Sequence, residues 1–167
     1  MVDTQKIYLK NALKIGHISR IGLISHMSTV SKKVFIAPSA LYAFIDRAHE
    51  KHNQASAYFR FFSEEEYLLY IDTVNLNETY DIIYKKMSPS LAKDFLRIVS
   101  LSDINVLYPD ESETKATVKT VINYNAIDLT FSEALMVVVA SKRGISQICT
   151  FDYLHPLFAL NVFFLPI

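Results

Sequence analysis

Short apolar runs alternate with longer segments of helical pattern along residues 33–167 of the chain. A run of four or five apolar residues that ends at a turn signal is typical of a strand buried on both faces. Apolar side chains that recur every three or four residues predict a helix with one buried face. The predicted strands are 34–37, 68–71, 104–108, 147–151 and 162–165, and the predicted helices are 39–45, 49–62, 73–87, 89–99, 113–124 and 130–143.

This alternation predicts the fold class. Almost wholly apolar strands need cover on both faces, and helices between them supply it, so the pattern indicates an α/β sandwich with a central parallel sheet of four to five strands. A length of 167 residues suits one such domain. The segments 25–33 and 109–112 are the candidate linkers.

Composition excludes several classes of protein. A share of 51% hydrophobic residues excludes a disordered chain, and a formal net charge of zero excludes a globally basic nucleic-acid-binding surface, though not a local one. With only three glycines, the chain has no glycine-rich phosphate loop, which argues against nucleotide-cofactor enzymes. Its single cysteine, Cys149, excludes a disulfide framework and a four-thiolate zinc site, and we read it as a buried small hydrophobe.

The same features set expectations about location. A chain with one cysteine fits a reducing compartment, so we expect a cytoplasmic protein. No run of about 18 apolar residues is present, so we expect no membrane span, and we see no secretory signal.

The first 32 residues differ from the rest in charge. No acidic residue occurs between Thr4 and Ile45, while basic residues recur at Lys6, Lys10, Lys14, Arg20, Lys32 and Lys33. We therefore divide the chain into a basic N-terminal extension, 1–32, and a domain, 33–167. The extension fits an accessory segment that packs on the domain or on a second copy, a partner-docking arm, a nucleic-acid-binding arm or a targeting presequence.

Three carboxylates fall where a parallel sheet collects its ligands. Asp152 directly follows a predicted strand, Glu133 lies in the first turn of a helix, and Glu78 lies in the helix after another strand. Ligands bind at the carboxyl ends of parallel strands, so these side chains can converge there. Carboxylates without histidine or cysteine neighbours form a hard oxygen site suited to Mg²⁺ or Mn²⁺, which can promote phosphodiester hydrolysis.

Each of these acids also has a structural explanation. Thr130 and Glu133 have the spacing of a capping box, which satisfies amide groups at a helix start. Glu78 fits a solvated helix face, and Asp152 fits a turn that ends a strand. The spacing alone therefore does not establish a nuclease.

Five segments together resemble the PIN-domain (PilT N-terminus) family, particularly its VapC-like toxin ribonucleases. They are VFIAPSALY at 34–42, NLNET at 75–79, LTFSEAL at 129–135, ICTFD at 148–152 and NVFFLP at 161–166. The resemblance implies a three-layer PIN-like sandwich and a Mg²⁺- or Mn²⁺-dependent endoribonuclease. It also implies RNA as substrate, an antitoxin protein as a possible inhibitor, and a homodimer.

Two positions depart from the family pattern. The aspartate of the family's first strand falls on Ala37, which cannot ligate a cation, and the usual aspartate of the third motif falls on Glu133. The resemblance then leaves Glu78, Glu133 and Asp152 as catalytic, metal-binding residues, with Ser39 and Asp128 as accessory candidates. Losing one charged ligand lowers affinity for a hard cation.

Ala37 leaves two functional hypotheses. The first is a metal-dependent endoribonuclease whose catalysis is impaired by Ala37; the second is a degenerate, non-catalytic PIN domain that binds RNA or protein. The alanine is either natural or was introduced to silence a toxic nuclease.

Some residues outside the carboxylate set also have two interpretations. Two basic pairs near helix ends, Lys85-Lys86 and Lys142-Arg143, can contact RNA phosphates or complement a helix dipole. His49 and His52 have helical spacing, but no third ligand is evident, so we expect surface histidines. We expect the aromatic cluster Tyr58, Phe59, Phe61 and Phe62 to belong to the core or a dimer surface.

Overall fold

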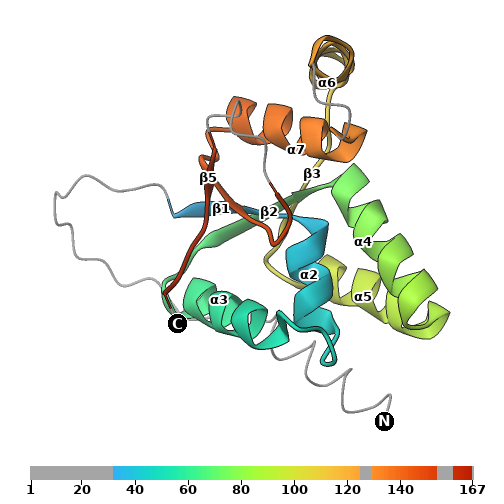
Figure 1. Cartoon of the computed structure of the whole chain (residues 1–167), viewed down its shortest axis with the longest axis vertical. Coiled ribbons are helices and arrows are strands. Elements are labelled where there is room, and N and C mark those ends of the chain that lie inside the picture. The colour runs from blue at the N-terminus through green and yellow to red at the C-terminus, as the bar shows by residue number, and fades with distance from the viewer. Residues whose placement is uncertain (1–31, 125–128, 154–159, 167) are drawn as a thin grey trace, which may run out of the picture.

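The computed structural model describes residues 32–124, 129–153 and 160–166. Its centre is a five-stranded sheet with the order β3-β2-β1-β4-β5, in which every pair of neighbours is parallel (Figure 1). The strands are β1 (Lys33–Ile36), β2 (Leu68–Asp72), β3 (Asn105–Leu107), β4 (Gln147–Cys149) and β5 (Asn161–Val162). The prediction of a parallel α/β sandwich is therefore confirmed.

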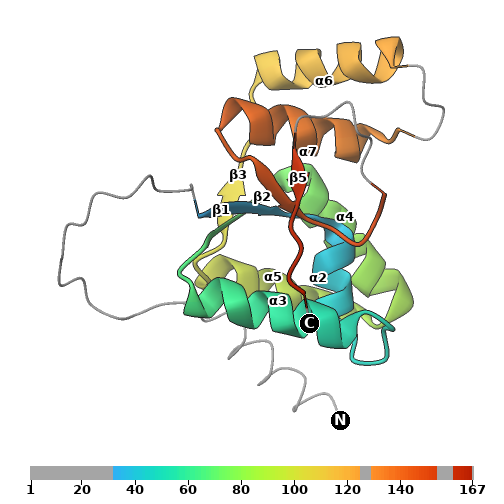
Figure 2. The ribbon, with the colours of Figure 1, turned by 60° about the vertical axis from the view of Figure 1, so that its left-hand side comes forward.

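Helices cover both faces of this sheet. They are α2 (Pro38–Ile45), α3 (His52–Glu64), α4 (Thr73–Lys86), α5 (Pro89–Leu101), α6 (Glu111–Asn123) and α7 (Phe131–Lys142). In Figures 1 and 2, α2, α3 and α5 lie on one side of the sheet, α7 lies on the other, and α6 packs outside α7. These layers are those of the PIN-like sandwich that the sequence predicts.

Strand β1 shows why both faces need cover. Val34 and Ile36 belong to the core shared with α2, α3 and α5, whereas Phe35 belongs to the core shared with α7. Successive side chains of a strand point to opposite faces, and all three of these are fully buried. An unbroken apolar run is therefore what this central strand requires.

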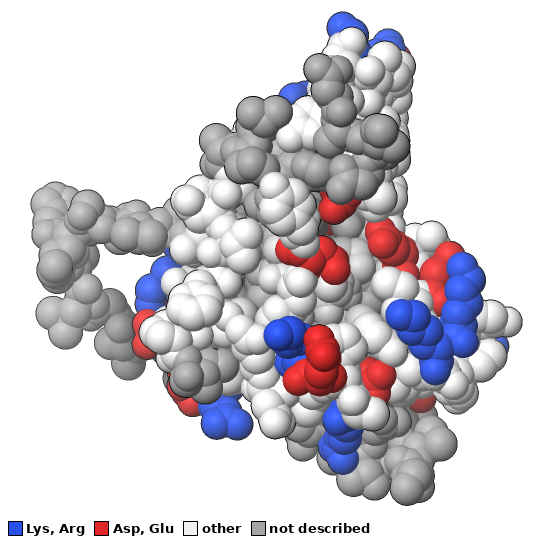
Figure 3. Space-filling view, in the orientation of Figure 1, with Lys and Arg blue, Asp and Glu red and all other residues white. Residues whose placement is uncertain are grey.

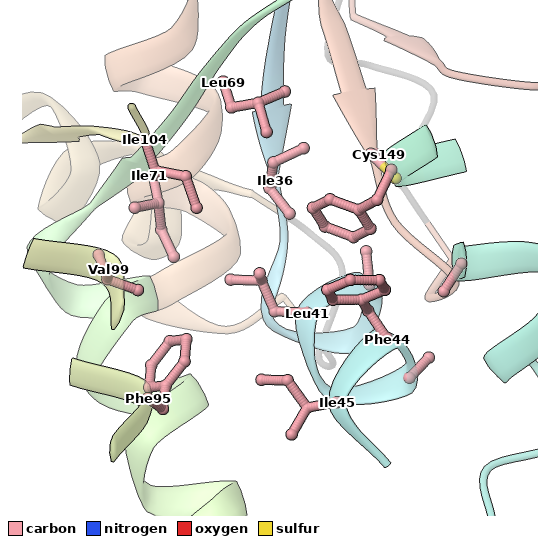
Figure 4. Close-up of a cluster of buried hydrophobic side chains, with 14 of the residues drawn as sticks. Ile36, Leu41, Phe44, Ile45, Leu69, Ile71, Phe95, Val99, Ile104 and Cys149 are labelled. Carbon is pink, nitrogen blue, oxygen red and sulfur yellow. The ribbon is translucent and has the colours of Figure 1, made fainter. Parts of the chain in front are cut away.

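The larger core lies between the sheet and helices α2, α3 and α5. Figure 4 shows Leu41, Phe44 and Ile45 of α2 pointing toward Ile36 of the sheet and Phe95 of α5. The aromatic cluster of α3 joins this core, because Tyr58, Phe59 and Phe62 are buried and Phe61 packs against them. The core assignment for these aromatics is confirmed.

Side-chain caps determine where four helices begin. Asp72 caps α4, Ser88 caps α5, and capping boxes open α6 and α7. The box of α6 is formed by Asp110 and Glu113, so the helix begins at Glu111. The prediction that 109–112 is a linker is wrong, because that segment caps and begins a helix.

Other boundaries move by a few residues. Residues 49–51 form a turn and α3 begins at His52, so the prediction that His49 and His52 share a helix face is wrong. The Nδ1 atom of His49 accepts from the amide of Lys51 at 3.1 Å, and that of His52 lies 3.0 Å from the carbonyl oxygen of Ala43. The strands predicted at 104–108, 147–151 and 162–165 are shorter than expected.

Within the described ranges, no helix combines the length and apolar character needed to cross a membrane. Of the basic extension 1–32, only Lys32 is among the described residues, so the predictions for this segment lie outside them.

Candidate functional site

The strand order reverses next to β1. The chain proceeds from β1 through β2 to β3 on one side of the sheet and then returns to β4 on the other side of β1. In an open parallel sheet, such a switch point leaves a crevice at the carboxyl ends of the two central strands. The candidate site is therefore expected where β1 and β4 end.

Hydrogen bonds hold the ends of these two strands together. The amide of Ala37 donates to the carbonyl of Cys149 at 3.0 Å, one residue beyond β1. The hydroxyl oxygens of Ser39 and Thr150 lie 3.1 Å apart, and Ser39 Oγ also accepts from the amide of Phe151 at 3.1 Å. Ser39, an accessory candidate from the sequence, thus fixes the loop after β4.

A cavity of about 220 Å³ occupies the switch point. Glu78, Glu133 and Asp152 all line it, and Ala37 forms part of its wall. We call it the acidic pocket; its other lining residues include Asn75, Thr130, Ser132 and Thr150. In Figure 3, acidic side chains gather near the middle of one face of the molecule. Three acids from distant segments therefore share one cavity.

The three acids reach this pocket from different elements. Glu78 comes from the second turn of α4, Glu133 from the first turn of α7, and Asp152 from the loop after β4. Helices α4 and α7 both start at the carboxyl edge of the sheet, so their first turns face the same crevice. Glu78 and Glu133 are half-buried, and Asp152 is exposed.

A fourth carboxylate, Asp72, is hydrogen-bonded to Asn75, which lines the pocket. It is the last residue of β2 and is fully buried. Its Oδ1 accepts from the amides of Val74 and Asn75 at 2.8 and 2.9 Å, and its Oδ2 accepts from the Nδ2 of Asn75 at 2.7 Å. Desolvation by burial raises the pKa of Asp72 above its ordinary value, against the hydrogen bonds, which lower it.

Asn75 joins the two helices that carry Glu78 and Glu133. Besides the bond to Asp72, its Nδ2 donates to the carbonyl of Ser132 in α7 at 3.3 Å. Sequence reasoning missed both Asp72 and Asn75. The available signal was that Asp72 directly follows an apolar strand, which is the criterion that selected Asp152.

Glu133 also serves as a helix cap. Its Oε2 accepts from the amide and the hydroxyl of Thr130 at 2.9 and 2.8 Å, while its own amide donates to Thr130 Oγ1 at 3.2 Å. This is the capping box that the sequence indicated. The box uses only one carboxylate oxygen, so Oε1 is left for the pocket.

The pocket suits a divalent cation in the kind of its ligand atoms but not in their spacing. The pocket offers carboxylate, hydroxyl and amide oxygens, which are the ligands that Mg²⁺ and Mn²⁺ prefer. However, among the described residues no three histidine, cysteine, aspartate or glutamate side chains are grouped closely enough to hold a metal ion. The site therefore suits such a cation in the kind of its ligands, while its ligand set is incomplete.

The remaining predicted site residues lie elsewhere. Arg143 pairs with the buried Glu113 of α6, through Nε–Oε1 and Nη2–Oε2 distances of 3.2 and 3.3 Å, and Lys142 donates to Ser112. Neither basic residue lines the acidic pocket, so the RNA contact proposed for them stays a prediction. Asp128 lies outside the described residues.

Comparison with solved structures identifies the fold. The crystal structure of Mycobacterium tuberculosis VapC20, a toxin that cleaves the sarcin-ricin loop, is similar with a TM-score of 0.65 and 18% sequence identity, over 71% of this chain and 89% of that one. The chain has the fold of a VapC-type PIN domain. No family model and no curated protein matches the chain. At this identity the likeness establishes the PIN-like fold, and the activity is argued below from the site.

Proposed function

We propose that the acidic pocket is the phosphodiester-hydrolysing site of a Mg²⁺- or Mn²⁺-dependent endoribonuclease, and that Ala37 impairs its catalysis. One observation carries the proposal. Glu78, Glu133 and Asp152 line a single cavity at the switch point of a PIN-like sheet, with Ala37 in its wall. The likeness to a toxin that cleaves RNA makes RNA the substrate to test first.

The three carboxylates would hold the cation, and each contributes differently. When bound, the cation supplies a water of lowered pKa and stabilises negative charge on the phosphate. Asp152 is exposed and reaches the pocket from a loop, whereas Glu78 is carried by α4. Glu133 has one oxygen in the capping box, which fixes the direction of its carboxylate.

Ala37 takes the place of a ligand that the family resemblance implies. It is the residue that follows β1, is buried, and lines the same pocket as the three acids. One charge fewer reduces the attraction for a divalent cation. It also relieves the repulsion among like charges in the absence of the cation.

Cleavage of RNA tests this proposal directly. The chain with Ala37, which we call the wild type, and the Ala37→Asp variant are incubated with a sarcin-ricin loop hairpin and an unrelated hairpin, with Mg²⁺, Mn²⁺ or EDTA. We expect Ala37→Asp to cut in a cation-dependent manner and the wild type to cut much more slowly. The double variant Ala37→Asp/Asp152→Asn is the matched control and should lose the gain. If Ala37→Asp fails to cut both hairpins, in Mg²⁺ and in Mn²⁺ alike, the nuclease proposal is wrong.

A second candidate is a non-catalytic PIN domain that binds RNA or protein. It is favoured by the incomplete ligand set among the described residues and by the alanine at position 37. Under this proposal the wild type binds RNA without cation and Ala37→Asp gains no cleavage. Salt-dependent affinity that falls when residues 1–31 are removed would assign RNA binding to the basic extension.

Both candidate functions have the same proposed partners, which are RNA, an antitoxin protein and a second copy of the chain. We propose that the protein acts in the cytoplasm. Sedimentation of the purified chain tests the homodimer, and a monomer at all concentrations would exclude it.

A further inference from the structure

A second hollow continues from the acidic pocket along α2 and α4. Its volume is about 380 Å³, and it shares Pro38, Glu78 and Asp152 with the acidic pocket. We call it the basic groove after His49, Lys51 and Lys86, which line it together with Tyr42; the carboxylates of Glu50, Glu78 and Asp152 line it as well. The nuclease proposal does not use these residues.

The basic end of the groove is carried by the same helix face as Glu78. Glu78, Ile82 and Lys86 follow one another at four-residue intervals on α4, and all three line the groove. Lys86 therefore lies about 12 Å beyond Glu78 along the helix axis, at about 1.5 Å per residue. A bound polyanion that leaves the acidic pocket along this face of α4 meets the positive charge of Lys86 two helical turns later.

Lys86 is held over the groove by an aromatic ring. Its Nζ lies 5.1 Å from the centroid of the Tyr42 ring, a cation–π contact. The phenol of Tyr42 is fixed in turn, because it donates to Asp46 Oδ2 at 2.8 Å, and its ring makes an edge contact with His49 at 5.4 Å. The ring orients the ammonium group without neutralising its charge.

The two lysines at the end of α4 differ in this respect. Lys85 lies 3.7 Å from Asp81, whereas Lys86 has no ion-pair partner within the part of the chain that is described; both also line a neighbouring hollow. Lys51 likewise has none among those residues, and its side chain is exposed. Both unpaired lysines line the basic groove.

The acidic groups of the groove are unevenly placed. Glu78 and Asp152 are at the end shared with the acidic pocket, and Glu50, next to Lys51, is the groove's remaining carboxylate among the described residues. An anion in the groove is thus repelled at the pocket end unless a cation is bound there. Lys86 and Lys51 attract it at the other end, where the charge of Glu50 offsets part of that attraction. Figure 3 shows acidic and basic side chains side by side on this face.

We propose that the basic groove is a phosphate subsite for single-stranded RNA, in which Lys86 and Lys51 contact backbone phosphates of a strand that enters the acidic pocket. The inference deepens the proposed function, since it supplies the path of the same substrate. Contacts to phosphates position a strand without reading its sequence, so the subsite sets affinity and register. Tyr42 acts as a positioning residue through Lys86.

Binding in EDTA tests the subsite separately from cleavage. A short fluorescein-labelled oligouridine is titrated with the full chain, and anisotropy is followed over a series of KCl concentrations. We expect Lys86→Gln and Lys51→Gln each to weaken binding about fivefold and to lower the salt dependence by about 0.7 in the log–log slope, the contribution of one contact to a single strand. Lys85→Gln, the adjacent control whose side chain is also exposed, should bind as the wild type.

Tyr42 provides a second readout. Tyr42→Phe keeps the ring and should retain wild-type affinity, while Tyr42→Leu should weaken binding as Lys86→Gln does, at temperatures where both variants are folded by circular dichroism. If Tyr42 acts through Lys86, Tyr42→Leu should have no further effect on binding in the Lys86→Gln background, whereas a merely structural role would weaken binding there too.

The outcomes separate the two proposals. The subsite is wrong if the wild type does not bind the oligouridine, or if Lys85→Gln weakens binding as much as Lys86→Gln. If the lysine pattern holds but Ala37→Asp never cleaves RNA, the subsite stands and the nuclease proposal fails.

Discussion

The amide Nδ2 of Asn75, a residue that lines the acidic pocket, donates to Oδ2 of the buried Asp72 at 2.7 Å. The same nitrogen reaches the carbonyl of Ser132 in α7. One side chain therefore links the end of β2 to α4 and α7, the two helices that carry Glu78 and Glu133. The relative position of Glu78 and Glu133 depends on this link.

Asp72 makes stability depend on pH. Burial raises its pKa in the folded protein, so the folded state binds a proton more tightly than the unfolded state, and stability falls as pH rises from about 3.9 through the raised pKa. Asp72→Asn keeps an N-cap acceptor but does not titrate. We expect the free energy of unfolding of wild type relative to Asp72→Asn to decrease with rising pH. Urea unfolding measures it, and parallel pH profiles would contradict the prediction.

Glu133 has two roles that one substitution separates. Glu133→Gln retains a side chain that suits the capping box but removes the charge. We expect thermal stability to change by only a few tenths of a kcal/mol, because glutamine also accepts from Thr130, while affinity for Mn²⁺ falls. Scanning calorimetry measures the thermal stability, and titration calorimetry measures the affinity for Mn²⁺. Unchanged Mn²⁺ binding would restrict Glu133 to capping.

The ion pair between Arg143 and Glu113 attaches α6 to α7. Glu113 is buried, and its bond to Arg143 lowers its pKa. Arg143→Ala leaves that carboxylate with the amide of Asp110 alone, and we expect a loss of about 1–2 kcal/mol in the free energy of unfolding at neutral pH. The loss should shrink as pH falls through the lowered pKa of Glu113, because protonation then removes the charge. A loss that does not change with pH would contradict this account.

Cys149 is a reporter of unfolding. It is fully buried in β4, and burial raises the pKa of its thiol. We expect the native chain to react with a thiol reagent such as dithionitrobenzoate only as fast as it opens, and the unfolded chain to react at once. Absorbance during a urea series measures this, and rapid reaction of the folded chain would place the thiol at the surface.

The sequence indicates the fold well where a pattern is local. The apolar run of β1 and the regular apolar stripe of α5 each predict one element, and the order of strands and helices predicts the parallel sheet. The start of a helix depends on its capping residue, and capping residues are also the residues that favour turns. Pro109 and Asp110 look like a break, yet Asp110 caps α6.

The site is only partly visible in the sequence. Glu78, Glu133 and Asp152 could be found because acids near the carboxyl ends of strands are expected to converge. The role of Asn75 could not, because its contact with Ser132 joins residues 57 positions apart. Lys86 could be singled out as one of a basic pair at a helix end, but the groove it lines could not, since Tyr42 and Lys86 meet only through packing of α2 on α4.

The central claim is that three distant acids and the vacated position at Ala37 form one divalent-cation site. Titration of Mn²⁺ into the wild type, Ala37→Asp and Ala37→Asp/Asp152→Asn by isothermal calorimetry tests it most directly. We predict that Ala37→Asp binds one Mn²⁺ about tenfold or more tightly than the wild type, because one charged ligand is added, and that Asp152→Asn removes the gain. Equal Mn²⁺ affinity in all three proteins would show that these side chains do not share an ion.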